Sequence, residues 1–131
     1  MPLRTTRTAP DIHDNRDNRA LASVNLDGND IRCSGIKAVA MVLKTSNISN
    51  LSIANCNITW KDDGRGYTME GAIEFSEAIN ANGALSKFTF SGDLRSSKPV
   101  TVEVGMTELD CSGKNLGASG AMLLATWLQH K

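Results

Sequence analysis

The residues with the clearest chemical potential lie in WKDDGRGYTMEG, residues 60–71, where two aspartates, a glycine and a glutamate occur together. Carboxylates spaced around a central glycine are typical of a calcium-binding loop of the EF-hand type. Placing Gly64 at the sixth loop position puts Thr59 at the first and Lys61 at the third, where carboxylate ligands belong. The register fails. We therefore interpret the stretch as a surface loop with glycine hinges and predict no metal site.

Two other patterns fail as sites for nucleotides or catalysis. The glycine-rich segment SGKNLGASG, residues 112–120, lacks the G-x-x-x-x-G-K-[ST] order that cradles phosphates. His13 and His130 stand at opposite ends of the chain, and neither has a cysteine at metal-ligand spacing. A Ser–His–Asp arrangement is equally unsupported. We expect a non-enzymatic protein without a cofactor.

Charge and hydropathy narrow the class of partner. Fourteen basic and fourteen acidic side chains cancel, which argues against binding nucleic acid or a membrane surface through bulk charge. No window approaches the roughly 18 consecutive apolar residues needed to span a bilayer. The expected partner is a protein of unknown identity.

The expected compartment is the cytoplasm. The first twenty residues contain arginines but no apolar core of a secretory signal. Three cysteines form an odd set without C-x-x-C spacing, and we interpret them as free thiols: Cys33, Cys56 and Cys111. Three Asn-x-Ser/Thr matches, interpreted as chance, begin at Asn47, Asn50 and Asn57.

An internal repeat defines the elements that position these residues. Apolar residues recur at offsets 1, 4 and 6, with a special residue at offset 9, in four stretches that begin at Leu21, Ile48, Leu85 and Met106. All but the third stretch also have an apolar residue at offset 11. The alternation within each stretch is typical of a strand. Three of them precede apolar sets with helical spacing, which are Ile36, Val39, Ala40 and Leu43; Ala72, Phe75, Ser76 and Ile79; and Ala121, Leu124, Ala125 and Leu128. A nine-residue insertion near 60–68 separates strand from helix in the second unit.

The pattern resembles the leucine-rich repeat signature L-x-x-L-x-L-x-x-N/C-x-L, and the repeat length resembles its ribonuclease-inhibitor-like subfamily. Asn29 and Cys56 match the N/C position, whereas Lys114 departs from it. The resemblance implies an α/β leucine-rich repeat solenoid of about three and a half units, with parallel strands on the concave face and helices on the convex face. We expect this domain to span 20–131, with an irregular unit at 85–105 whose helix is replaced by an extended segment or hairpin. Residues 1–19 are predicted to be a flexible arm, or alternatively an N-terminal cap that packs Ile12 against the first strand.

In a leucine-rich repeat array, strand residues on the concave face bind partners. The candidates on this face are Asn25, Asp27, Asn50, Ser52, Lys87, Glu108 and Asp110. Candidates on the insertion and on an apolar C-terminal flank are Trp60, Tyr67, Met122, Leu123 and Trp127. The main hypothesis is a non-catalytic protein-interaction scaffold, and a merely solvated sheet face is the structural alternative.

Two further hypotheses stay open. The resemblance permits a regulator of an enzyme, of the GTPase-activator or inhibitor type. The apolar C-terminal flank favours a homo-oligomer or continuation into further repeats.

Overall fold

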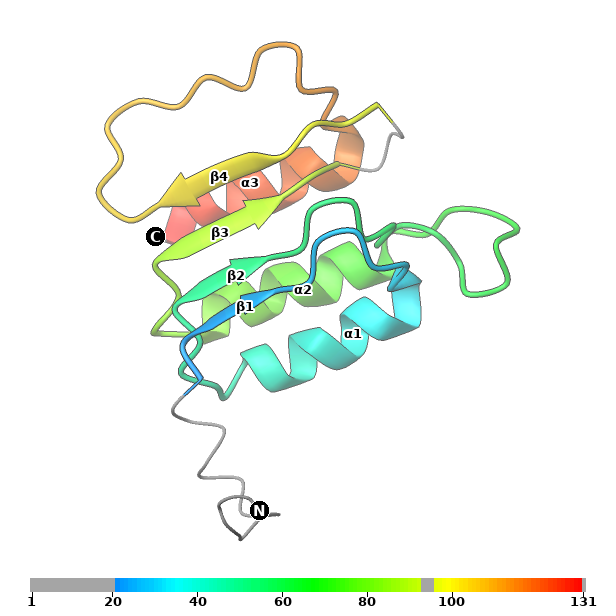
Figure 1. Cartoon of the computed structure of the whole chain (residues 1–131), viewed down its shortest axis with the longest axis horizontal. Coiled ribbons are helices and arrows are strands. Elements are labelled where there is room, and N and C mark those ends of the chain that lie inside the picture. The colour runs from blue at the N-terminus through cyan, green and yellow to red at the C-terminus, as the bar shows by residue number, and fades with distance from the viewer. Residues whose placement is uncertain (1–20, 93–95, 131) are drawn as a thin grey trace, which may run out of the picture.

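Strands and helices alternate along the chain, and the computed structural model describes them over residues 21–92 and 96–130. The predicted arm at 1–19 lies outside these residues. The elements are β1 (Ser23–Asn25), α1 (Arg32–Leu43), β2 (Asn50–Ser52), α2 (Glu70–Ala81), β3 (Lys87–Phe90), β4 (Val100–Glu103) and α3 (Gly117–His130). The helices of this described part cover one face of a single sheet (Figure 1).

The sheet has the strand order β1-β2-β3-β4. β1, β2 and β3 are parallel, and their register pairs Ser23 with Asn50 and Asn50 with Lys87. The alignment of the first three units predicts this register correctly. Each connection between these strands contains a helix, because a chain that returns to a parallel neighbour must cross over the sheet.

The buried faces of α1 and α2 also agree with the predicted helical sets. Ile36 and Leu43 of α1 are fully buried, as are Phe75 and Ile79 of α2. The core continues into an aromatic cluster around Phe88, whose ring centroid lies 5.7 Å from that of Phe75. The helix spacing and the strand alternation therefore identify the core of the first two units.

The predicted leucine-rich repeat solenoid is wrong. β4 runs antiparallel to β3, and the sheet does not curl into an arc (Figure 1). The segment expected to form the fourth parallel strand begins at Met106 and is irregular, with Met106 45% exposed and Leu109 37% exposed. The physical reason is the short connection after β3. The nine residues between β3 and β4 are too few for a helical crossover, and those that the structure describes, 91–92 and 96–99, lie in no helix. The chain therefore returns as an antiparallel strand and occupies the edge that the fourth unit would need.

The predicted buried face of α3 is also wrong by one residue position. Leu123 is fully buried and Trp127 is 4% exposed, whereas Leu128 is 68% exposed. Ala121 and Ala125 of the predicted set are exposed as well. Trp127 packs on Phe88 with ring centroids 6.2 Å apart, so the largest side chain of α3 determines which face of the helix is buried.

The special positions at offset 9 show how two units are joined. The Cys56 thiol is buried and donates a hydrogen bond to the backbone oxygen of Leu26 in the preceding unit, at 3.1 Å. The side-chain amide of Asn29 donates to the same oxygen at 2.8 Å. Burial raises the pKa of the Cys56 thiol, which keeps it protonated as a donor.

None of the helices within residues 21–92 and 96–130 is long and apolar enough to cross a membrane.

Candidate functional site

The sheet face opposite the helices carries two rows of polar side chains. Side chains alternate between the two faces of a strand, so residues flanking the buried Leu51, Phe88 and Val102 point away from the core. The strand register aligns them in two rows across the sheet, Ser23–Asn50–Lys87–Glu103 and Asn25–Ser52–Thr89–Thr101. We call these eight residues the open face.

Four of the predicted residues belong to the open face: Asn25, Asn50, Ser52 and Lys87. Asp27 lies just beyond β1 at its rim, where its carboxylate accepts hydrogen bonds from the Ser52 hydroxyl at 2.6 Å and the Ala54 backbone N–H at 2.8 Å. The structure thus brings together five of the seven residues that the sequence assigned to one surface. Asp27 holds this surface in place by tying the turn after β1 to the end of β2.

The other two predicted residues, Glu108 and Asp110, do not lie on the open face. They belong to the irregular segment between β4 and α3, where both are exposed. The side chain and backbone N–H of Ser112 donate hydrogen bonds to Asp110 and hold the pKa of its carboxyl below the ordinary value. Asp110 therefore stabilises the turn in which it lies and makes no contribution to the sheet surface.

β4 supplies two residues in their place that the sequence reasoning missed. Thr101 stands opposite Thr89, with their hydroxyl oxygens 2.8 Å apart, and Glu103 stands opposite Lys87. The alternating run Val100, Val102 contained the signal, because Thr101 and Glu103 occupy its outward positions. The missing information was that this run pairs with β3.

The open face combines hydroxyls and amides with one cation and one anion. Lys87 and Glu103 are cross-strand neighbours of opposite charge, an arrangement that stabilises a sheet modestly. Ser52, Thr89 and Thr101 form a strip of hydroxyls beside this pair. Chemically, the face can exchange hydrogen bonds with a polar surface or backbone, and its small side chains allow close approach.

The insertion forms a second surface beyond the carboxyl ends of β1 and β2, beside the start of α1 (Figure 1). Trp60 and Tyr67 form an antiparallel bridge, and their rings meet edge to face with centroids 5.1 Å apart. Tyr67 remains 60% exposed. The predicted surface loop is thus closed by the contact between Trp60 and Tyr67, and it exposes the aromatic ring of Tyr67.

Hydrogen bonds fasten this insertion to the first turn of α1. The Asp62 carboxylate accepts from the Ser34 backbone N–H at 3.1 Å, and the Asp62 backbone oxygen accepts from Arg32 at 3.0 Å. Arg32 also forms an ion pair with Asp30 at 2.9 Å. The hydrogen bond from Arg32, and next that from Asn57, lowers the pKa of Asp30, while the bonds from Ser34 lower the pKa of Asp62.

No family model, curated protein or solved structure matches this chain. The resemblance to leucine-rich repeat proteins stays a prediction from the sequence pattern.

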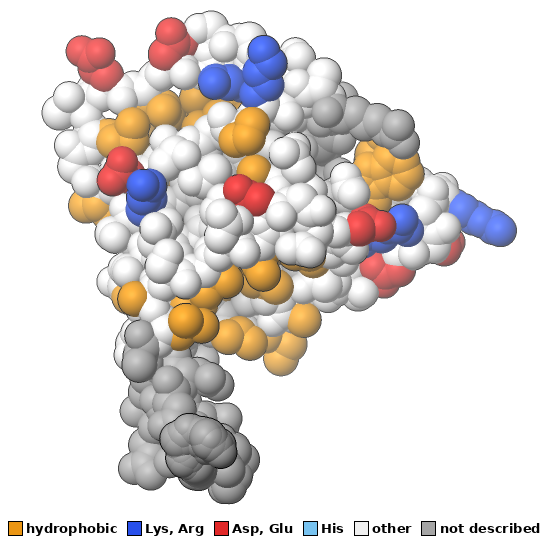
Figure 2. Space-filling view, in the orientation of Figure 1, with side chains coloured by type: hydrophobic (Ala, Val, Ile, Leu, Met, Phe, Trp, Pro, Cys, Tyr) orange, Lys and Arg blue, Asp and Glu red, His pale blue; other side chains and the backbone are white. Residues whose placement is uncertain are grey.

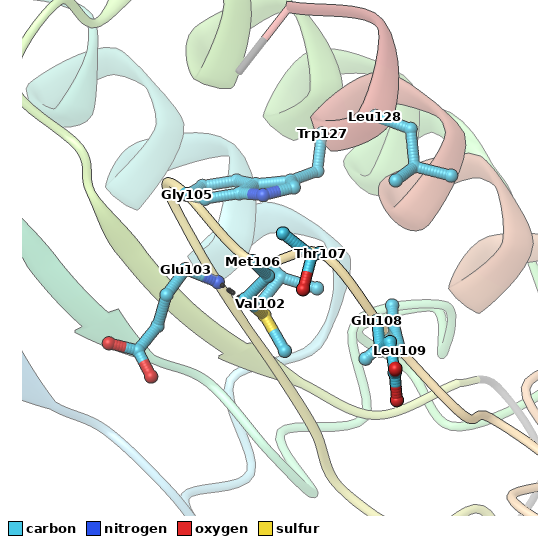
Figure 3. A pocket seen from close by; sticks show the side chains of 9 residues that line it. All are labelled: Val102, Glu103, Gly105, Met106, Thr107, Glu108, Leu109, Trp127 and Leu128. Carbon is cyan, nitrogen blue, oxygen red and sulfur yellow. Dashed lines mark hydrogen bonds between the residues drawn. The ribbon is translucent and has the colours of Figure 1, made fainter.

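The predicted apolar C-terminal flank needs correction, because two of its three residues belong to the core. Leu123 and Trp127 are buried, and Met122 is half-buried. Trp127 still borders a pocket of about 270 Å³ between the end of β4, the following loop and α3. Figure 3 shows its indole reaching toward Gly105 and Met106, while the Glu103 carboxylate points away from the ring.

Among residues 21–92 and 96–130, no group of three or more His, Cys, Asp or Glu side chains is placed to hold a metal ion.

Proposed function

We propose that this protein is a non-catalytic interaction module that binds a protein partner through the open face. The observation that supports this is the one-sided arrangement of the sheet, whose second face presents two rows of polar side chains that no described helix covers (Figure 1). Parallel strands are usually covered on both faces of their sheet, so an uncovered polar face over the parallel β1, β2 and β3 is unusual.

The composition of the open face indicates how it binds. Its residues are small or flexible, and the insertion rather than the sheet carries the exposed aromatic side chain. Tight protein interfaces usually depend on Trp, Tyr and Arg anchors. In this proposal the partner supplies those anchors, and the hydroxyl strip of Ser52, Thr89 and Thr101 supplies hydrogen bonds around them.

We also propose a cytoplasmic location. The structure contains three free cysteines, of which Cys33 and Cys56 are buried and Cys111 is half-buried. Free thiols persist in reducing compartments, where disulfides are rare.

The test compares co-purification of partners with the intact wild-type chain and with two charge-reversed variants. Lys87→Glu changes the middle of the open face, whereas Asp110→Lys changes an exposed carboxylate away from it. We expect Lys87→Glu to lose a specific partner and Asp110→Lys to keep it. Retention by Lys87→Glu together with loss in a Tyr67→Ala variant would instead assign binding to the insertion.

A further inference from the structure

An apolar groove lies at the β1 edge of the molecule, away from the open face and from the predicted C-terminal flank. It has a volume of about 320 Å³ between β1 and α1. All of its lining residues are aliphatic, and we call those nearest the surface the apolar flank: Val24, Leu26, Ala38, Val39, Val42 and Ile48. Figure 2 shows orange side chains gathered along this lower edge of the molecule.

The apolar flank is exposed to a degree that needs an explanation. Val42 is 61% exposed and the adjacent Met41 is 70% exposed. The side chains of α1 that pack against α2 are buried, whereas those of the flank have no described element packed over them. Contiguous apolar surface of this kind usually marks an interaction site.

β1 adds a second unpaired feature at the same place. It pairs with β2 along one edge, and within the described residues no strand pairs with its other edge. An edge strand offers free backbone N–H and C=O groups to another strand. The flank therefore combines an open strand edge with an aliphatic groove directly beside it.

We infer that a second copy of this chain covers the apolar flank in a two-fold dimer. Antiparallel pairing of β1 with its counterpart would keep both sets of helices on the same side of a continuous sheet and place the two α1 helices side by side. Such an isologous contact uses the same patch twice, so the patch must be complementary to itself. This patch meets the electrostatic part of that condition, because none of its lining residues carries a charge.

The charged side chains of α1 are engaged elsewhere. Lys37 binds Glu70 of α2 at 2.8 Å, and Arg32 pairs with Asp30 at 2.9 Å. Self-contact across the flank therefore brings together aliphatic groups and avoids the like-charge repulsion that penalises many symmetric contacts. The hydrophobic burial then contributes about 25 cal/mol for each Å² of apolar surface removed from water.

Two other occupants fit less well. The opposite end of the sheet bears Glu103 and Glu108, and burying carboxylates against an uncharged groove is costly, which disfavours a head-to-tail contact. Besides Met1, residues 1–20 contain two large aliphatic side chains, those of Leu3 and Ile12, among many charged ones. That composition is a poor match for a groove lined entirely by aliphatic residues.

The test is the mass of the intact chain in solution, measured by size exclusion with light scattering over a range of concentrations. We expect the mass to double from 14.0 kDa and to reach a plateau at two copies. Val42→Glu should return it to one copy at concentrations where the wild type is a dimer. The matched control is Ile73→Glu, which places the same charge on an exposed position of α2 and should leave the dimer intact.

Each other outcome overturns the inference. A wild-type chain that stays at one copy throughout means that another segment or solvent occupies the flank. A mass that rises past two copies indicates head-to-tail association. Because Val42 is largely exposed, its variant should fold, and circular dichroism checks this. A folded Val42→Glu chain that remains a dimer would place the contact elsewhere.

Discussion

At the scale of single residues, a buried amide joins two parts of the fold. Asn82 is 1% exposed, and its side chain donates to Leu43 O at 2.8 Å and to Ser46 O at 3.3 Å. Its amide oxygen accepts from the backbone N–H groups of Ala84 and Leu85, each at 2.7 Å. One side chain thus connects the end of α1 to the turn that leads into β3.

Replacing this amide should be among the most damaging polar substitutions. Asn82→Ala leaves buried backbone groups without these partners, at about 1–3 kcal/mol for each group that remains unsatisfied. We expect a loss of about 3 kcal/mol in the free energy of unfolding, measured by urea denaturation. The control is Asn29→Ala, which removes an exposed bond to Leu26 O and should cost less than 1 kcal/mol. Equal losses in the two variants would contradict the role assigned to Asn82.

A second residue, Asp62, makes the attachment of the insertion sensitive to pH. The hydrogen bonds from Ser34 lower the pKa of its carboxyl from the ordinary value of 3.8. A carboxylate with a lowered folded-state pKa stabilises the fold above its unfolded pKa, and this contribution disappears as the pH falls through the folded value. The attachment should therefore weaken below pH 3.8 and be intact at neutral pH.

The variant Asp62→Asn isolates this effect, because it keeps the oxygen acceptor and removes the charge. We expect the wild type to be more stable than the variant at neutral pH, with the difference shrinking as the pH falls below 3.8. Urea denaturation at both pH values measures it. Asp63→Asn serves as the control, because the Asp63 carboxylate accepts a hydrogen bond from Arg65 within the insertion. A wild-type advantage that stays constant with pH would rule out the charge as its source.

At the scale of elements, α3 provides the sharpest check on the corrected helix face. Trp127→Ala should lower the free energy of unfolding by about 3–5 kcal/mol, because it empties a core site against Phe88. Leu128→Ala, one residue later, should change it by less than about 0.5 kcal/mol, since Leu128 is 68% exposed. The face predicted from the repeat alignment requires the reverse order. Chemical denaturation of the two variants therefore shows which of the two faces of α3 is buried.

The same helix shows why part of the sequence prediction failed. The spacing Ala121, Leu124, Ala125, Leu128 is a valid helical stripe, but so is the neighbouring set Ser119, Gly120, Leu123, Trp127 that the structure buries. Two adjacent stripes on one helix cannot be distinguished by periodicity when both contain apolar residues. α2 lacks that ambiguity, and its buried face was predicted correctly. The predicted face of α1 is also the buried one, although Ala38, Met41 and Val42 offer a second apolar set at helical spacing.

The fourth strand failed for a different reason, which concerns connection rather than periodicity. The sequence from Met106 to Leu116 matches a repeat. A parallel strand there would, however, need an unpaired strand edge beside it. β4 reaches the edge of β3 first through the short connection 91–99, and its Val100 and Val102 fill the core positions. Sequence alone identified the alternating run, but not its partner. Two residues of the open face were missed as a consequence.

At the scale of the whole molecule, an aromatic cluster joins the parallel part of the fold to the part that contains α3. Phe88 of β3 stacks with Phe75 of α2 and Phe90 of β3, at centroid distances of 5.7 and 5.0 Å, and contacts Trp127 of α3 at 6.2 Å. The antiparallel β4–α3 part therefore shares its core with the parallel β1–β3 part. We expect the described elements to unfold in one cooperative transition, as small single domains usually do.

This cooperativity can be tested with two probes, one of which reports on α3 and the other on all the helices. The chain has two tryptophans, so in a Trp60→Phe background fluorescence reports Trp127 alone, while far-ultraviolet circular dichroism reports the helices together. Their denaturation curves should coincide, and Phe88→Leu should shift both by the same amount, about 1–2 kcal/mol, because it weakens a contact common to α2, β3 and α3. An earlier fluorescence transition, or a shift confined to one probe, would mean that β4 and α3 unfold separately. The open face would then consist of two independently stable halves, and Thr101 and Glu103 could leave it while the parallel strands remain folded.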